Sequence, residues 1–96
     1  MKLNIAGIEW DEGNRQKCQK HGLTIAEIEA FFAEENYRVI ADSKHSSHTE
    51  QRFIAVGRSK ERLLFIGFTL RAKEMGIMIR PISARYMREK EARKLW

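Results

Sequence analysis

The chain of 96 residues is long enough for one folded domain, residues 1–96, and too short for a second hydrophobic core. Hydrophobic residues make up 43% of it and charged residues 32%, as in globular proteins, and its longest apolar run, residues 63–70, is too short to cross a bilayer. The single cysteine excludes an internal disulfide and no secretory signal is recognisable, so we expect a cytoplasmic protein. The net charge of +5 favours a polyanionic partner.

The first third of the chain carries helical signals. Residues 3–10 are apolar enough for an edge strand, although Gly7 weakens it. Asp11 is a suitable N-cap for a helix through residue 21, and Gly22 then supplies the left-handed residue that ends it. Thr24 and Glu27 have the spacing of a capping box, which predicts a second helix over residues 25–35 with one apolar stripe.

From Tyr37 the hydrophobic period becomes two, which indicates strands. We expect an antiparallel meander, and the run that is apolar on both faces is its central strand. Pro81 cannot donate a ladder hydrogen bond, so we expect an edge or a bulge there. Ser83 then resembles the N-cap of a basic helix that continues to the C-terminus. The expected strands are residues 37–42, 52–58, 62–71 and 76–83, and the expected fold class is α+β with two N-terminal helices, this sheet and a C-terminal helix.

Charge is unevenly distributed along the chain. Residues 80–96 hold six basic and two acidic residues, whereas residues 27–35 hold four acids and no base. This asymmetry suggests one face for a polyanion and another for solvent or a basic partner.

Two sets of residues are candidates for chemistry. Lys20 and His21 stand at the end of the first helix, where an imidazole can exchange protons near neutral pH, although cations there also simply complement the helix dipole. Arg52, Arg71 and Arg85 bracket the predicted strands, and arginine matches phosphate oxygens bidentately. Whether Arg52 and Arg71 approach each other depends on strand register.

Other constellations are weaker. His45 and His48 lie in a polar loop near Glu50, but without further ligands they do not make a zinc signature, so we expect no metal and no cofactor. Cys18 has no partner pattern for a nucleophilic thiol.

Four stretches, in this order, resemble the BrnT family of toxin ribonucleases from bacterial type II toxin–antitoxin pairs. They are IEWDEGNRQKCQKHGLTIAEIEAFF (8–32), QRFIAVGRS (51–59), FTLR (68–71) and IRPISARYMREKE (79–91). The resemblance implies a fold similar to RelE-type toxins and a metal-free endoribonuclease site. It also implies inhibition by a BrnA-like ribbon-helix-helix antitoxin, through which alone the pair binds operator DNA.

Carried onto this sequence, the resemblance implies catalytic roles for Lys20, His21, Arg71 and Arg85. Glu50, Arg52 and the basic Arg88 are candidates for RNA binding. The turn between Arg71 and the last strand looks slightly long for the family, and position 14 holds Asn where a base is common.

Because RNA supplies its own nucleophile, the 2′-OH, the mechanism needs only charge stabilisation and proton transfer. Arg71 and Arg85 would hold the phosphate, while His21, or Lys20 if neighbouring cations depress its pKa, would move protons. Two alternatives remain open, a non-catalytic module that binds nucleic acid or an antitoxin, and a metal-dependent hydrolase using His45 and His48. The antitoxin would cover the acidic helix, an open sheet edge near Pro81, or the basic site itself.

Overall fold

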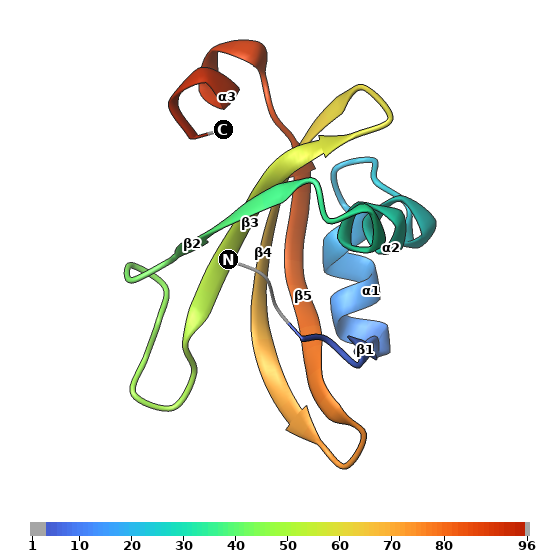
Figure 1. Cartoon of the computed structure of the whole chain (residues 1–96), viewed down its shortest axis with the longest axis vertical. Coiled ribbons are helices and arrows are strands. Elements are labelled where there is room, and N and C mark those ends of the chain that lie inside the picture. The colour runs from blue at the N-terminus through green and yellow to red at the C-terminus, as the bar shows by residue number, and fades with distance from the viewer. Residues whose placement is uncertain (1–3, 96) are drawn as a thin grey trace.

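The computed structural model describes residues 4–95 and has an α+β fold, with three helices and a five-stranded mixed sheet among these residues (Figure 1). The first residue of the expected strand 3–10 and the last of the expected C-terminal helix lie outside the described residues. In chain order the elements are β1 (Gly7–Ile8), α1 (Glu12–Gln19), α2 (Ile25–Glu34), β2 (Tyr37–Ala41), β3 (Arg52–Ser59), β4 (Arg62–Lys73), β5 (Gly76–Tyr86) and α3 (Glu89–Leu95).

Both N-terminal helices begin at the residues that the capping signals predict. The Asp11 carboxylate accepts from the backbone N–H of Asn14, and the Thr24 hydroxyl accepts from that of Glu27, so each helix has a reciprocal capping box. Gly22 follows α1 with φ of 98°, the left-handed conformation expected of it. The capping boxes and the glycine therefore confirm the predicted starts of both helices and the break between them.

The strands pair in the order β1-β5-β4-β3-β2, and β4 is central as expected. β2 to β5 form an antiparallel meander, but β1 pairs with β5 in parallel, so the sheet is mixed rather than purely antiparallel. β3 and β4 are joined by Lys60 and Glu61, both at positive φ, as a two-residue hairpin turn requires.

The predicted start of the last helix is wrong. Ser83 does not cap a helix, because β5 continues to Tyr86 and α3 begins at Glu89. Ala84 is buried in the core while Arg85 lies on the other face of the sheet opposite Phe65, an alternation that belongs to a strand. The long partner strand β4 keeps β5 extended, since Leu64 still pairs with Tyr86.

Pro81 lies at a bulge, as its missing N–H predicts. Phe68 pairs with Pro81 and Gly67 with Ser83, which leaves Ile82 as the extra residue of β5. Within the described residues 4–95, β5 has no strand neighbour on its outer side beyond Ile79, so a sheet edge lies near Pro81 as expected. This edge is not open at Pro81, because Asn14 of α1 donates from Nδ2 to the Pro81 carbonyl at 2.9 Å. Helix α1 therefore lies along β5 where β1 ends.

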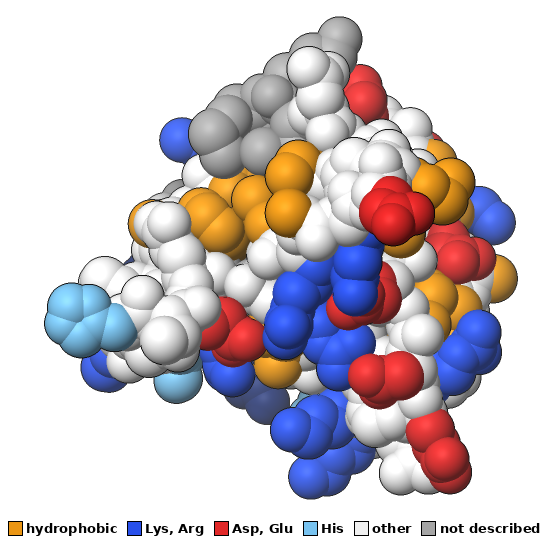
Figure 2. Space-filling model, turned by 90° about the horizontal axis from the view of Figure 1, so that it is seen from below, with side chains coloured by type: hydrophobic (Ala, Val, Ile, Leu, Met, Phe, Trp, Pro, Cys, Tyr) orange, Lys and Arg blue, Asp and Glu red, His pale blue; other side chains and the backbone are white. Residues whose placement is uncertain are grey.

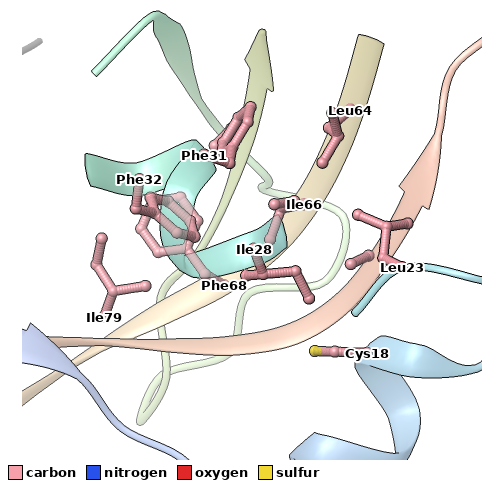
Figure 3. Close-up of a cluster of buried hydrophobic side chains, with 11 residues drawn as sticks. Cys18, Leu23, Ile28, Phe31, Phe32, Leu64, Ile66, Phe68 and Ile79 are labelled. Atoms are coloured by element: carbon pink, nitrogen blue, oxygen red, sulfur yellow. The ribbon is translucent and has the colours of Figure 1, made fainter. Parts of the chain in front are cut away.

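Side chains alternate between two hydrophobic clusters, one on each face of the sheet. On one face Ile28, Phe31 and Phe32 of α2 pack on β4, together with Leu23 and Cys18 (Figure 3). The smaller cluster on the other face joins Val56 and Leu63 to Met87 and Ala92, which hold α3. The rest of this second face is not covered by a helix, and it carries the polar residues of β4.

No helix among residues 4–95 has the length and apolar character needed to span a membrane.

Candidate functional site

A basic pocket of about 250 Å³ opens beside the start of α1, and we call it the Arg71 pocket. Helix α1 forms one wall, and Glu50 from the loop before β3 and residues from strands β3, β4 and β5 form the remainder. Four of its residues are cations and one is an acid. The lining residues are Gly13, Asn14, Lys17, Glu50, Arg52, Thr69, Arg71, Arg80, Pro81 and Ile82.

Strand register brings Arg52 and Arg71 together, which the sequence alone leaves open. Arg52 pairs with Thr69, two residues before Arg71, so the two arginines are diagonal neighbours on one face. Glu50 joins them, because its carboxylate accepts from Arg52 Nε at 2.9 Å and from Arg71 Nη2 at 3.3 Å. One carboxylate thus holds two guanidinium groups at the mouth of the pocket.

Arg80 belongs to a second ion-pair network at the same end of the sheet. Its guanidinium contacts Glu9 at 3.3 Å and Asp11 at 2.8 Å, and Lys73 contacts the other oxygen of Glu9 at 2.8 Å. The hydrogen bond from Lys73, with help from Arg80, lowers the pKa of Glu9. The backbone N–H of Asn14, and then Arg80, lower the pKa of Asp11. Both acids are therefore held as carboxylates at neutral pH.

Seen from the end of the molecule that carries the β4–β5 turn, Lys and Arg side chains gather across the middle of the surface, with Asp and Glu side chains around them (Figure 2). The cations in this region come from α1, β3, β4 and β5. The basic character therefore arises from the fold and not from one charged run of sequence.

Arg85 lies in a different pocket, of about 700 Å³, which we call the α3 pocket. Its lining residues are Arg85, Tyr86, Arg88, Lys90, Glu91, Lys94 and Leu95. The Arg85 guanidinium lies 4.2 Å from the centre of the Phe65 ring and forms two hydrogen bonds with Glu91, at 2.8 and 2.7 Å. The Glu91 carboxylate raises the pKa of Arg85, and Arg85 lowers that of Glu91.

The structure does not bring Arg71 and Arg85 to one point. Arg85 pairs with Phe65 and Arg71 with Met78, so the two positions are six residues apart on β4, a distance of roughly 20 Å along the strand. Residues 65 and 71 are an even number apart, so both arginines project from the face of the sheet that α1 and α2 do not cover. They flank one surface from its two ends.

Lys20 and His21 are exposed at the end of α1. The following Gly22 lies beside the Tyr86 ring, whose Cε2 is 4.0 Å from the point where a Cβ would be, so this turn is close to the end of β5 that carries Arg85. Gly13 and Lys17 line the Arg71 pocket, and Lys20 lies one turn beyond Lys17 on the same stripe of the helix. Neither Lys20 nor His21 lines the Arg71 pocket or the α3 pocket.

Sequence reasoning missed Lys17 and Arg80 as site residues. The helical spacing between Lys17 and Lys20 was a usable signal, since residues three apart share a face. Arg80 had no such signal, because its position opposite Thr69 depends on the pairing register of β4 with β5.

The remaining candidates lie apart from both pockets. His45 Nδ1 is 2.8 Å from Asp42 Oδ2, and His48 is exposed. Among residues 4–95, no group of three or more His, Cys, Asp or Glu residues has the arrangement to hold a metal ion. Cys18 is fully buried, and burial raises the pKa of its thiol to about 11.

The acidic segment 27–35 takes part in internal contacts as well as facing solvent. Glu27 accepts from the Tyr86 hydroxyl at 2.7 Å, Glu29 accepts from Trp10 Nε1 at 3.2 Å, and Glu34 accepts from the Ser59 hydroxyl at 3.2 Å. These contacts tie α2 to β5, β3 and the segment before α1. Some of the acidic side chains of this segment therefore stabilise the fold.

Two comparisons with known proteins bear on these pockets. Residues 10–91 match the model of a protein family described as ribonuclease toxin, BrnT, of type II toxin-antitoxin system. A comparison with curated proteins finds no match. The matched region contains the whole Arg71 pocket and all of the α3 pocket except Lys94 and Leu95.

Proposed function

The chain belongs to the BrnT family of ribonuclease toxins from type II toxin–antitoxin systems, and we propose that it is an endoribonuclease that cleaves RNA without a metal ion on the uncovered face of its sheet. The observation that carries this proposal is the convergence of Lys17, Arg52, Arg71 and Arg80 on one pocket. Four cations line this pocket with one acid, Glu50, while Arg80 also contacts Glu9 and Asp11 outside it, and such a cluster of cations suits the phosphates of a nucleic acid.

RNA binding in this proposal extends from one pocket to the other. Because Arg71 and Arg85 flank the same face at a separation of roughly 20 Å along β4, we assign them to different phosphates of one strand. Arg52 and Arg71 hold the strand in the Arg71 pocket, with Glu50 orienting both guanidinium groups. Arg88, which lines the α3 pocket, adds a further phosphate contact.

We assign bond cleavage to the end of the sheet that carries Arg85, because the turn with Lys20 and His21 lies beside Tyr86 at the same end. The 2′-oxygen attacks phosphorus, the bond from phosphorus to the 5′-oxygen breaks, and a 2′,3′-cyclic phosphate and a 5′-hydroxyl remain. His21 and Lys20 exchange the two protons, from the 2′-OH and to the departing 5′-oxygen. Arg85 stabilises the negative charge on the phosphorane, and Arg71 positions the strand through a phosphate several nucleotides away.

The type II family also implies an antitoxin partner. We propose that this partner is a BrnA-like ribbon-helix-helix protein, that the pair contacts operator DNA only through it, and that the toxin acts in the cytoplasm, where its RNA substrate is. The fold similar to RelE-type toxins that the resemblance implies is part of the same proposal. We propose the exposed part of the acidic helix α2 and the basic face as the candidate surfaces for the antitoxin.

Cleavage of single-stranded RNA in excess EDTA tests the assignment of residues. We expect Arg85→Ala and His21→Ala each to slow cleavage by about 10²-fold or more, the usual effect of losing a charge-stabilising or proton-transferring group. Arg15→Ala is the matched control, because Arg15 is an exposed arginine of α1 that lines neither pocket.

Full activity of the Arg85→Ala and His21→Ala double variant would overturn the assignment. Folded wild-type protein that binds RNA tightly and never cleaves it would instead favour the non-catalytic binding module. Circular dichroism of each variant separates loss of activity from loss of fold.

A further inference from the structure

Arg85 and Glu91 form a bidentate ion pair, in which Nη1 and Nη2 of the guanidinium donate to the two carboxylate oxygens. Arg85 comes from β5 and Glu91 from α3. A phosphate group uses the same two parallel N–H donors of an arginine that a carboxylate uses. Glu91 therefore fills the position on Arg85 that a phosphate would take.

The surroundings of this pair favour an anion larger than one carboxylate. Arg88, Lys90 and Lys94 line the α3 pocket together with Arg85, and Glu91 is the only acid among its lining residues. The Arg85 guanidinium lies over the Phe65 ring, which fixes its plane while leaving its edge towards Glu91. A pocket of about 700 Å³ with four cations has room and charge for a phosphodiester.

Glu91 can leave Arg85 without unfolding the domain. Its side chain remains about one-third exposed, and that of Arg85 is 40% exposed, so solvent and ligands reach the pair. Helix α3 is held by Ala92 and Leu95, which pack against the cluster around Val56 and Leu63, and not by Glu91 alone. Partly exposed ion pairs contribute little to stability, so a competing anion can displace the carboxylate.

We propose that the α3 pocket is an RNA phosphate site that the Glu91 carboxylate occupies in the free protein, so that RNA must displace Glu91 to reach Arg85. The inference rests on the proposed function, because it takes RNA as the ligand. It adds a regulatory role for Glu91 and phosphate-binding roles for Lys90 and Lys94. The end of the sheet that carries α3 is opposite the β4–β5 turn, so this site is separate from the Arg71 pocket (Figure 1).

The test compares Glu91→Gln with Glu89→Gln in the full chain. Both variants remove one negative charge from α3, but only Glu91 lines the pocket. The probe is a fluorescent single-stranded 2′-O-methyl oligonucleotide, which cannot supply the nucleophile, and its Kd is measured by anisotropy at several salt concentrations. We expect Glu91→Gln to bind about 2- to 5-fold more tightly than Glu89→Gln, the factor for losing a partly exposed ion pair.

Arg85 must mediate that gain. In an Arg85→Gln background, the difference between Glu91→Gln and Glu89→Gln is expected to vanish. Equal affinities of the two single variants, or a difference that persists without Arg85, would overturn the inference.

A second pair of variants tests the pocket without changing Glu91. Lys94 lines the pocket and its neighbour Arg93 does not. We expect Lys94→Gln to lower affinity and to reduce the salt dependence of log K by about 0.7, the value for one phosphate contact on a single strand. Arg93→Gln should change the affinity and the salt dependence less than Lys94→Gln does. Equal changes in the two variants would contradict the proposed site.

The outcomes separate this inference from the proposed function. If the wild type cleaves RNA while Glu91→Gln and Glu89→Gln bind alike, the function stands and the role of Glu91 falls. If no variant binds or cleaves RNA, both the proposed function and the role of Glu91 are refuted.

Discussion

Asn14 of α1 donates from Nδ2 to the carbonyl of Pro81, 67 positions away on β5, at a distance of 2.9 Å. The same amide group donates to the Glu9 carbonyl at 3.0 Å, and Asn14 also completes the capping box with Asp11. A single buried side chain thus fixes the start of α1, closes the sheet edge beside the bulge and forms one wall of the Arg71 pocket.

Loss of this side chain should weaken the whole fold. Asn14→Ala leaves the Pro81 carbonyl without its donor and removes half of the capping box, so we expect a loss of about 1–3 kcal/mol in the free energy of unfolding. Urea denaturation measures it. Asn36→Ala is the control, because Asn36 is exposed and its bond to the Arg58 carbonyl is 3.4 Å long. Equal losses in the two variants would contradict the role given to Asn14.

RNA affinity should depend on Arg71 more than on a surface arginine. We expect Arg71→Gln to weaken binding of a 2′-O-methyl oligonucleotide and to lower the salt dependence of log K by about 0.7, because one phosphate contact is lost. Arg15→Gln removes the same charge from outside the pockets and should change both quantities less. If the two variants gave the same binding titrations, the Arg71 pocket would not contact the RNA.

The protein should lose stability in acid, in part through Glu9. Lys73 and Arg80 hold the pKa of Glu9 below its usual value of 4.5 in the folded state. A carboxyl whose pKa is lower in the folded than in the unfolded state stabilises the fold above the unfolded value, and that contribution is lost as the pH falls through the folded value. Melting temperatures between about pH 6 and about pH 3 should therefore fall less steeply for Glu9→Gln than for the wild type. A parallel decline would exclude this contribution.

Cys18 should be inert in the folded protein. It is fully buried, and its pKa of about 11 leaves the thiol protonated at neutral pH. A thiol reagent such as DTNB should react slowly with native protein and rapidly after urea is added. Rapid reaction under native conditions would mean that Cys18 is accessible.

Local signals in the sequence predicted the local parts of the fold. The capping residues Asp11 and Thr24, the left-handed Gly22 and the doubly apolar central strand act over a few residues, and the structure confirms each. The predicted helix start at Ser83 was wrong because it rested on a local capping signal. The pairing of β5 with β4 through Tyr86 is a long-range interaction that overrides this signal.

The candidate site was less predictable because it depends on register. The sequence offers Arg52, Arg71 and Arg85 as equivalent boundary arginines, but pairing with Thr69 joins Arg52 to Arg71, while pairing with Phe65 takes Arg85 to α3. The ion pair between Arg85 and Glu91 requires β5 to end at Tyr86, which the predicted helix start excluded. Residue types were recognisable from sequence, and their partners were not.

Cleavage of a single-stranded RNA in EDTA, with analysis of the product ends, tests the central claim most directly. The substrate is compared with the same oligonucleotide carrying a 2′-deoxy nucleotide at the cleaved position. We expect a 2′,3′-cyclic phosphate from the all-RNA strand and no cleavage at the deoxy position. Cleavage at the deoxy nucleotide, or activity only after a divalent metal is restored, would contradict it.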